Sequence, residues 1–223
     1  QARRSGWLPP PEKLAVARSA VGPDTLRLVT ESHGVVLERP GMRLDLGGIG
    51  MGYAADRAIE VLERHGIRSA LVDASGDIRA SGPPPGSAGW RVSLAPLAVG
   101  NDPERGRRPG LFGERAHAAV TTSGDAYQAV EIDGRRYSHV VDPRSGTGVS
   151  GPAAVTVVAR DCTTADAMAT AASVLGPQAG SAAIEREPGC AARFVWVEDG
   201  TERTVETARW SAQVSHLPHE RRM

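Results

Sequence analysis

Residues 163–170 read Thr-Thr-Ala-Asp-Ala-Met-Ala-Thr and place a carboxylate, Asp166, four residues before a hydroxyl, Thr170. The alanine-rich segment predicts a helix over residues 163–175, and side chains four residues apart lie on the same side of a helix. A carboxylate and a hydroxyl are hard oxygen ligands, which suit Mg²⁺ better than zinc. Such a pair is also typical of a solvated helix face, so its meaning depends on the rest of the chain.

Three glycine-containing segments precede this helix. They read Asp-Leu-Gly-Gly-Ile-Gly-Met-Gly-Tyr-Ala-Ala-Asp over 45–56, Thr-Thr-Ser-Gly-Asp over 121–125 and His-Val-Val-Asp-Pro-Arg-Ser-Gly over 139–146. The first segment leads into an amphipathic helix, whose N-terminal amides favour an anion, and glycine lets the backbone approach a ligand or a metal. A tight turn between strand and helix explains that segment equally well by itself. The four segments together favour a metal-and-phosphate site.

Two side chains in the later segments can take part in chemistry. Ser123 follows an apolar strand and either donates to a phosphate or stabilises a turn. No Gly-x-Ser-x-Gly motif surrounds it, which argues against a hydrolase nucleophile. His139 lies three residues before Asp142-Pro143 and can act as a general base, because histidine titrates near neutral pH. A single histidine is more often structural, so the neighbouring motifs carry this interpretation.

Composition excludes several classes of protein. The 223 residues contain 26 Lys and Arg and 26 Asp and Glu, so the net charge is zero, which argues against nucleic-acid or membrane-surface binding. Lys13 is the only lysine, which nearly excludes lysine-dependent chemistry. The sequence contains no run of about 18 apolar residues, so no transmembrane segment is predicted. Cys162 and Cys190 lack the spacing of a zinc site; they can pair, but small buried thiols are the simpler interpretation.

The pattern along the chain predicts one α+β domain over residues 1–223, with a mostly antiparallel sheet and packed helices. Gly176-Pro177 is expected to end the 163–175 helix, and Asp133-Gly134 is expected to form a hairpin turn. Residues 100–115 are expected to form a surface loop. Further helices are predicted over 10–21, from the glycine turn (Gly47–Gly52) to Gly66, and over 181–187. Extended segments are predicted over 25–30, 35–38, 42–46, 69–73, 90–95, 118–122, 126–132, 154–159 and 193–198.

These four segments resemble the ApbE family of FAD:protein FMN transferases. The family pattern Asp-Leu-Gly-Gly-Ile-Ala-Lys-Gly-Tyr-Ala-x-Asp is similar to residues 45–56, and Thr-Ser-Gly is similar to 122–124. His-Ile-Ile-Asp-Pro-x-Thr-Gly is similar to 139–146, and Thr-Ala-Asp-Ala-x-Ala-Thr to 164–170. The resemblance covers roughly residues 20–210 and implies an ApbE-like fold. The family's N-terminal Gly-Ala-Phe-Asp-Pro segment is not found. We therefore expect the C-terminal part of the family fold, with weak FAD binding and poor FMN transfer by residues 1–223 alone.

The resemblance also implies a reaction and its groups. Family members use Mg²⁺ to transfer FMN from FAD to a Thr or Ser hydroxyl of an acceptor protein, releasing AMP. Many are bacterial lipoproteins anchored on the outer side of the cytoplasmic membrane; no such signal is visible here, so the compartment stays open. By resemblance, the metal ligands are Asp166, Thr170 and the Gly48 carbonyl, His139 is the base, and the FAD contacts include Asp45, Met51, Ser123, Gly124, His139 and Val140.

Two other functions stay open. Met51 stands where the family has lysine, which removes a cation beside a pyrophosphate and favours a flavin-binding module without transferase activity. The same site with water as the acceptor would make an FAD pyrophosphatase that releases free FMN. Detection of AMP separates transfer from binding, and the identity of the flavin product separates transfer from hydrolysis.

Overall fold

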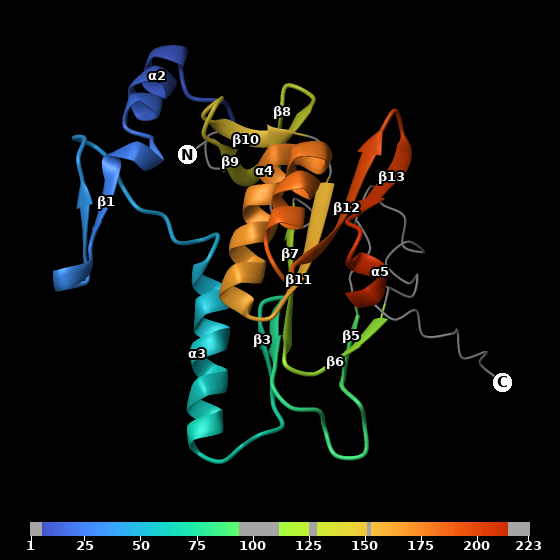
Figure 1. The fold of residues 1–223 in the computed structure, drawn as a ribbon. Helices are drawn as coiled ribbons and strands as arrows, with labels where there is room; N and C mark the ends of the chain where they lie inside the picture. Colours follow the sequence, from blue (N-terminus) through green and yellow to red (C-terminus); the bar gives the residue numbers. More distant parts are fainter. Residues whose placement is uncertain (1–5, 94–111, 125–128, 151–152, 214–223) are drawn as a thin grey trace.

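The structure, a computed structural model, describes residues 6–93, 112–124, 129–150 and 153–213 (Figure 1). Its centre is a six-stranded sheet in the order β13-β12-β11-β7-β4-β3, in which all neighbouring strands are antiparallel. This arrangement confirms the expected α+β class with mostly antiparallel pairing. The strands are β3 (Leu71–Ala74), β4 (Asp77–Ala80), β7 (Ala118–Gly124), β11 (Ala153–Ala159), β12 (Ala191–Glu198) and β13 (Thr201–Glu206).

Three hairpins owe their tight turns to pairs of residues with positive φ. Ser75-Gly76 joins β3 to β4, and Asp199-Gly200 joins β12 to β13. Asp133-Gly134 joins β8 (Ala129–Ile132) to β9 (Arg135–Asp142), as the sequence predicts. Two central residues with positive φ match the right-handed twist of the strands, and Asp-Gly is a preferred sequence for such a turn.

Two helices cover one face of the sheet, α3 (Gly50–Arg64) and α4 (Cys162–Arg186) (Figure 1). Small side chains on α4 allow this close packing. Gly176, with φ 80° and ψ 174°, breaks α4 before Pro177, so the expected end of the first helix is confirmed. The second piece of α4 starts earlier than residue 181 because Pro177 fits the first turn of a helix. The core between helices and sheet includes Ala165, Ala169, Ala172, Val155, Val157, Ala192 and Phe194.

The opposite face of the sheet packs on a second, smaller core. Val158 follows Val157 on β11, and successive side chains of a strand point to opposite faces. Val158 contacts this second core together with Trp210 of α5 (Trp210–Gln213), whose side chain is fully buried. Strand β5 (Trp90–Ser93) pairs with β6 (Phe112–Arg115) and contributes Val92 to it.

The remaining elements lie around this body. Strand β10 (Thr147–Ser150) joins β9 and β8 in a three-stranded sheet. Figure 1 shows helix α2 (Pro11–Ser19) and the β1–β2 hairpin (Leu26–Val29 and Gly34–Leu37) standing apart from the main sheet. Two short 3-10 helices, Pro23–Thr25 and Thr30–Ser32, flank β1. None of the helices in the described part of the chain combines the length and hydrophobicity that a membrane crossing requires.

Several expectations need correction. Residues 42–46 form no strand, because they lead into the glycine turn without a pairing partner. Residues 112–115 of the expected loop form β6, while 94–111 lie outside the described residues. Ser123 and Gly124 belong to β7 rather than following it. The simpler interpretation of the two cysteines is confirmed, because both are free and buried, and burial raises the pKa of Cys190 to about 11.

Candidate functional site

The structure brings the three expected metal ligands together where α3 begins. Asp166 and Thr170 lie one turn apart on α4, and Asp166 is 6% exposed. The backbone amide of Gly52, in the first turn of α3, donates to Asp166 Oδ2 at 3.0 Å. Gly48 lies in the turn that precedes α3, and a Cβ at this glycine would stand 3.2 Å from Thr170 Oγ1. The glycine backbone therefore lies directly against the Thr170 side chain.

The surroundings of this site disfavour the ionised forms of two carboxyl groups, Asp166 and Asp77. Burial raises the pKa of Asp166, and the hydrogen bond from Gly52 acts in the opposite direction. Burial, with further contributions from Asp166 and Asp73, raises the pKa of Asp77 to about 6. Nearby carboxylates disfavour each other's ionisation, and a bound cation reverses that effect. Asp77, at the start of β4, is a further carboxyl of this group and was not among the expected ligands.

The available donors fit magnesium better than zinc. Within the described residues, no three His, Cys, Asp or Glu side chains gather around a common point. Asp166, Thr170 and Gly48 offer a carboxylate, a hydroxyl and a backbone carbonyl, all hard oxygen donors. Mg²⁺ usually takes one or two carboxylates from the protein and completes its six ligands with water and substrate phosphates. A partly filled oxygen site is therefore suited to Mg²⁺ held jointly with a phosphorylated ligand.

The glycine turn exposes a run of apolar side chains beside these ligands. Asp45 Oδ1 accepts a hydrogen bond from the Gly47 amide at 2.8 Å and so stabilises the turn. Met51 is 43% exposed, and its neighbours Leu46 and Tyr53 are 64% and 55% exposed. A concentration of exposed apolar side chains is typical of a surface that binds a ligand or another chain.

Ser123 and Gly124, at the end of β7, face the same helix. Ser123 Oγ lies 3.5 Å from Ser173 Oγ, and the Ser173 hydroxyl donates to the Thr170 carbonyl at 2.8 Å. A Cβ at Gly124 would stand 2.7 Å from the Ala153 carbonyl oxygen on β11. Close packing of strands therefore accounts for the glycine at position 124. Ser123 faces Ser173, which lies about one turn after Thr170 on α4.

His139 and Val140 lie on β9, in a hairpin that is anchored to α4. The Arg144 guanidinium binds both carboxylate oxygens of Asp142, at 2.9 Å from Nε to Oδ1 and 2.9 Å from Nη2 to Oδ2. Nη2 also donates to the Val174 carbonyl of α4 at 3.0 Å. Hydrogen bonding to Arg144 lowers the pKa of Asp142. The hairpin is thus fixed to the helix that carries Asp166, and His139 is exposed on its surface.

Sequence reasoning missed Asp56 and Arg79. Asp56 is buried on α3 and accepts hydrogen bonds from the first turn of α4, and its Oδ1 lies 3.0 Å from Arg79 Nε. One signal could have indicated Asp56: it follows Ala55 on the buried face of an amphipathic helix. A carboxylate in such a position needs hydrogen-bond or charged partners, because burying it alone is costly.

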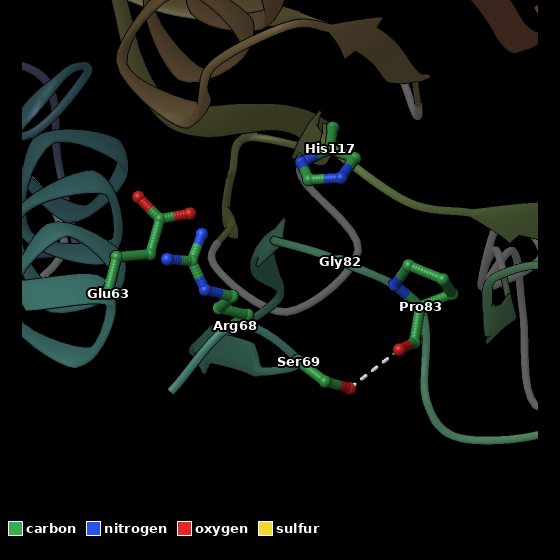
Figure 2. A pocket seen from close by; sticks show the side chains of 6 residues that line it. All are labelled: Glu63, Arg68, Ser69, Gly82, Pro83 and His117. Carbon is green, nitrogen blue, oxygen red and sulfur yellow. Dashed lines mark hydrogen bonds between the residues drawn. The ribbon is translucent and has the colours of Figure 1, made fainter. Parts of the chain in front are cut away.

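A separate cavity of about 530 Å³ lies away from these ligands, and Figure 2 shows the six residues that line it. It is placed at the C-terminal end of α3 and the start of β7, whereas the expected ligands lie at the opposite ends of both elements. At 1.5 Å per residue, α3 alone separates the two places by about 20 Å. The cavity is therefore distinct from the candidate metal site. Its lining residues are Glu63, Arg68, Ser69, Gly82, Pro83 and His117.

The fold and the site together define an α+β protein with a hard-oxygen site at the start of a helix, an arrangement suited to a magnesium-bound phosphate. The chain belongs to the ApbE family, whose family model matches residues 1–194. The structure resembles Pseudomonas stutzeri flavinyl transferase ApbE in its apo form, with a TM-score of 0.77 and 32% identity. That match covers 93% of this chain and 62% of the other.

Two further proteins resemble the chain closely. The flavin transferase ApbE from Vibrio cholerae has a TM-score of 0.79 and 26% identity, over 93% of this chain and 63% of that one. The FAD:protein FMN transferase of Treponema pallidum (strain Nichols) is 36% identical over 177 residues, which are 74% of this chain and 46% of that protein. The chain spans about half the length of the curated relatives it matches.

Proposed function

We propose that this chain belongs to an enzyme that transfers FMN from FAD to a threonine or serine hydroxyl of an acceptor protein and releases AMP. The observation that carries the proposal is the convergence of Gly48, Asp166 and Thr170 at the start of α3. The relatives named FAD:protein FMN transferase support the same substrate and the same kind of acceptor. Asp166, Thr170 and the Gly48 carbonyl would hold Mg²⁺.

The proposed reaction breaks one phosphoanhydride bond and forms one phosphoester bond. The acceptor hydroxyl oxygen attacks the phosphorus on the FMN side of FAD, and AMP leaves with the bridging oxygen. His139, on the surface of β9, takes the proton of the hydroxyl. A bound magnesium ion would supply positive charge that stabilises the phosphate oxygens during the transfer.

The exposed turn before α3 is the proposed nucleotide contact. Met51, Leu46 and Tyr53 offer apolar surface for the aromatic rings of FAD beside the metal ligands. Asp45, Ser123, Gly124 and Val140 complete the proposed FAD contacts. Met51 supplies no charge to the pyrophosphate, so we propose that FAD binds more weakly here than to a relative with lysine at this position.

The test is to mix the protein with FAD, Mg²⁺ and a threonine-containing acceptor peptide. We expect AMP release together with a gain in the mass of the peptide that equals FMN less one water. Asp166→Ala should abolish both, whereas Glu202→Gln, an exposed change on β13, should not affect them. Free FMN without modified peptide would show that the protein hydrolyses the pyrophosphate instead of transferring FMN. FAD binding without AMP release would show that it is a flavin-binding module.

A further inference from the structure

Asp56 is a buried acid that the proposed reaction does not use. Its side chain lies on the second turn of α3, and the residue is 9% exposed. Oδ1 accepts a hydrogen bond from the Cys162 amide at 2.9 Å, and Oδ2 accepts from the Thr163 amide at 2.8 Å and the Thr163 hydroxyl at 2.6 Å. Arg79 Nε, 3.0 Å from Oδ1, adds a cation. A carboxylate has about four acceptor positions, so these donors fill them.

The donors to Asp56 belong to the first turn of α4. Amides at the start of a helix have no partner within the helix and must find one outside. Asp161, the residue before α4, accepts from the Thr164 amide at 2.7 Å and is the ordinary N-cap. Asp56 binds the two preceding amides from a different helix. Its negative charge also lies at the positive end of the α4 dipole.

A matching contact runs from α4 back to α3. Asp166 accepts the hydrogen bond from the Gly52 amide, which belongs to the first turn of α3. Each helix therefore supplies one carboxylate that binds first-turn amides of the other helix. Gly52 permits this approach, because a Cβ there would stand 2.8 Å from the Asp166 Cβ. The two carboxylates together fix how far α3 and α4 can slide past each other.

We propose that Asp56, held by Arg79, is a positioning residue for the metal site. It sets the register of α3 against α4 and so brings Gly48 to Asp166 and Thr170. The inference rests on the proposed function, because it takes these three residues as the metal ligands. Gly48 moves with α3, and the other two ligands move with α4. A slip of one residue, about 1.5 Å, would disrupt an octahedral site with Mg–O distances of about 2.0–2.1 Å.

The test measures binding of Mn²⁺, a probe for hard-oxygen sites, by electron paramagnetic resonance titration. Asp56→Asn removes the charge and replaces one acceptor oxygen by a donor. We expect Mn²⁺ affinity to fall about 10- to 100-fold, the usual effect of losing a group that orients a metal ligand. The matched control is Asp161→Ala, which removes the other carboxylate from the same end of α4 without touching α3. It should lower the melting temperature and leave Mn²⁺ affinity unchanged.

Two results would overturn the inference, and a second variant covers a failure to fold. A folded Asp56→Asn protein with wild-type Mn²⁺ affinity overturns the inference. An equal loss of affinity in Asp161→Ala also overturns it, because affinity would then follow the stability of α4. If Asp56→Asn does not fold, Arg79→Lys, which keeps the charge and loses the guanidinium geometry, is judged by the same criterion.

The same titration separates this inference from the proposed function. Absence of Mn²⁺ binding in the unaltered protein would overturn both the metal site and the role of Asp56. Mn²⁺ binding that depends on Asp56, without transfer of FMN to an acceptor, would overturn the proposed function and leave the positioning role standing.

Discussion

Asp77→Asn is expected to stabilise the protein at neutral pH and to have little effect in acid. Asp77 is partly buried at the start of β4, and burial together with Asp166 and Asp73 raises its pKa from 3.8 to about 6. A carboxyl with a raised pKa holds its proton more tightly in the folded state than in the unfolded state. The folded protein therefore loses stability as the pH rises through the interval between these two values.

The size of the effect follows from the same two values. Each pH unit between 3.8 and about 6 corresponds to about 1.4 kcal/mol, so about 3 kcal/mol is the upper limit once the carboxyl is fully ionised, and solvent screening of this partly exposed side chain reduces it. Asparagine resembles the protonated acid in shape and carries no charge. Asp77→Asn should therefore raise the free energy of unfolding at about pH 7.5 by up to about 3 kcal/mol, and by little near pH 4.

Urea denaturation at both pH values, in buffer with a chelator, measures this difference. The chelator is needed because a bound cation beside Asp166 would itself favour the ionised form of Asp77. Glu202→Gln, which removes one exposed charge on β13, serves as the control. A gain of equal size at both pH values, or a loss at neutral pH, would refute the argument that an ionised Asp77 is strained by burial and by Asp166.

Three further changes test other parts of the site. Gly52→Ala should lower the unfolding free energy, measured by chemical denaturation, by about 1–3 kcal/mol, because the new Cβ would collide with α4. Gly50→Ala is the control: its Cβ would meet only Leu46 Cβ at 3.9 Å, so the change should be neutral or stabilising. Met51→Lys should tighten FAD binding, followed by flavin fluorescence, by about 10- to 150-fold, since a charge-assisted hydrogen bond contributes about 1.5–3 kcal/mol; unchanged affinity would mean that this side chain points away from the pyrophosphate. His139→Ala should slow FMN transfer by about 10²- to 10⁴-fold and leave the FAD dissociation constant and melting temperature unchanged; a large fall in melting temperature would instead make His139 structural.

The parts of the fold that local pattern determines could be predicted from the sequence. The spacing of Ala55, Ile59 and their neighbours predicts α3, and Gly176-Pro177 predicts the break in α4. Asp133-Gly134 predicts its hairpin, because the turn type depends on adjacent residues alone. Strand β13 could not be predicted in this way. All its residues are exposed, so it lacks the alternation of apolar and polar side chains that indicates a strand.

Only some residues of the candidate site could likewise be predicted from local sequence patterns. Asp166 and Thr170 are recognisable because they lie on one helix at a regular spacing. The roles of Asp56, which ends the 45–56 segment, and of Asp77 are not recognisable, because burial and distant charged groups determine them. Asp56 binds amides 106 and 107 residues away in the chain, and no local pattern indicates such partners. Ion pairs and caps between elements depend on tertiary packing, which a single sequence does not specify residue by residue.

The sequence distance between α3 and α4 also has a consequence for folding. The hydrogen bond between Gly52 and Asp166 joins residues 114 positions apart. Contacts of such long range close late, because the entropy of a large loop must be lost before they form. During synthesis at about 5–20 residues per second, several seconds pass between the emergence of the two helices. The candidate metal site can therefore form only after α4 has been made and docked, so a growing chain would bind the cation only once most of its sheet is in place.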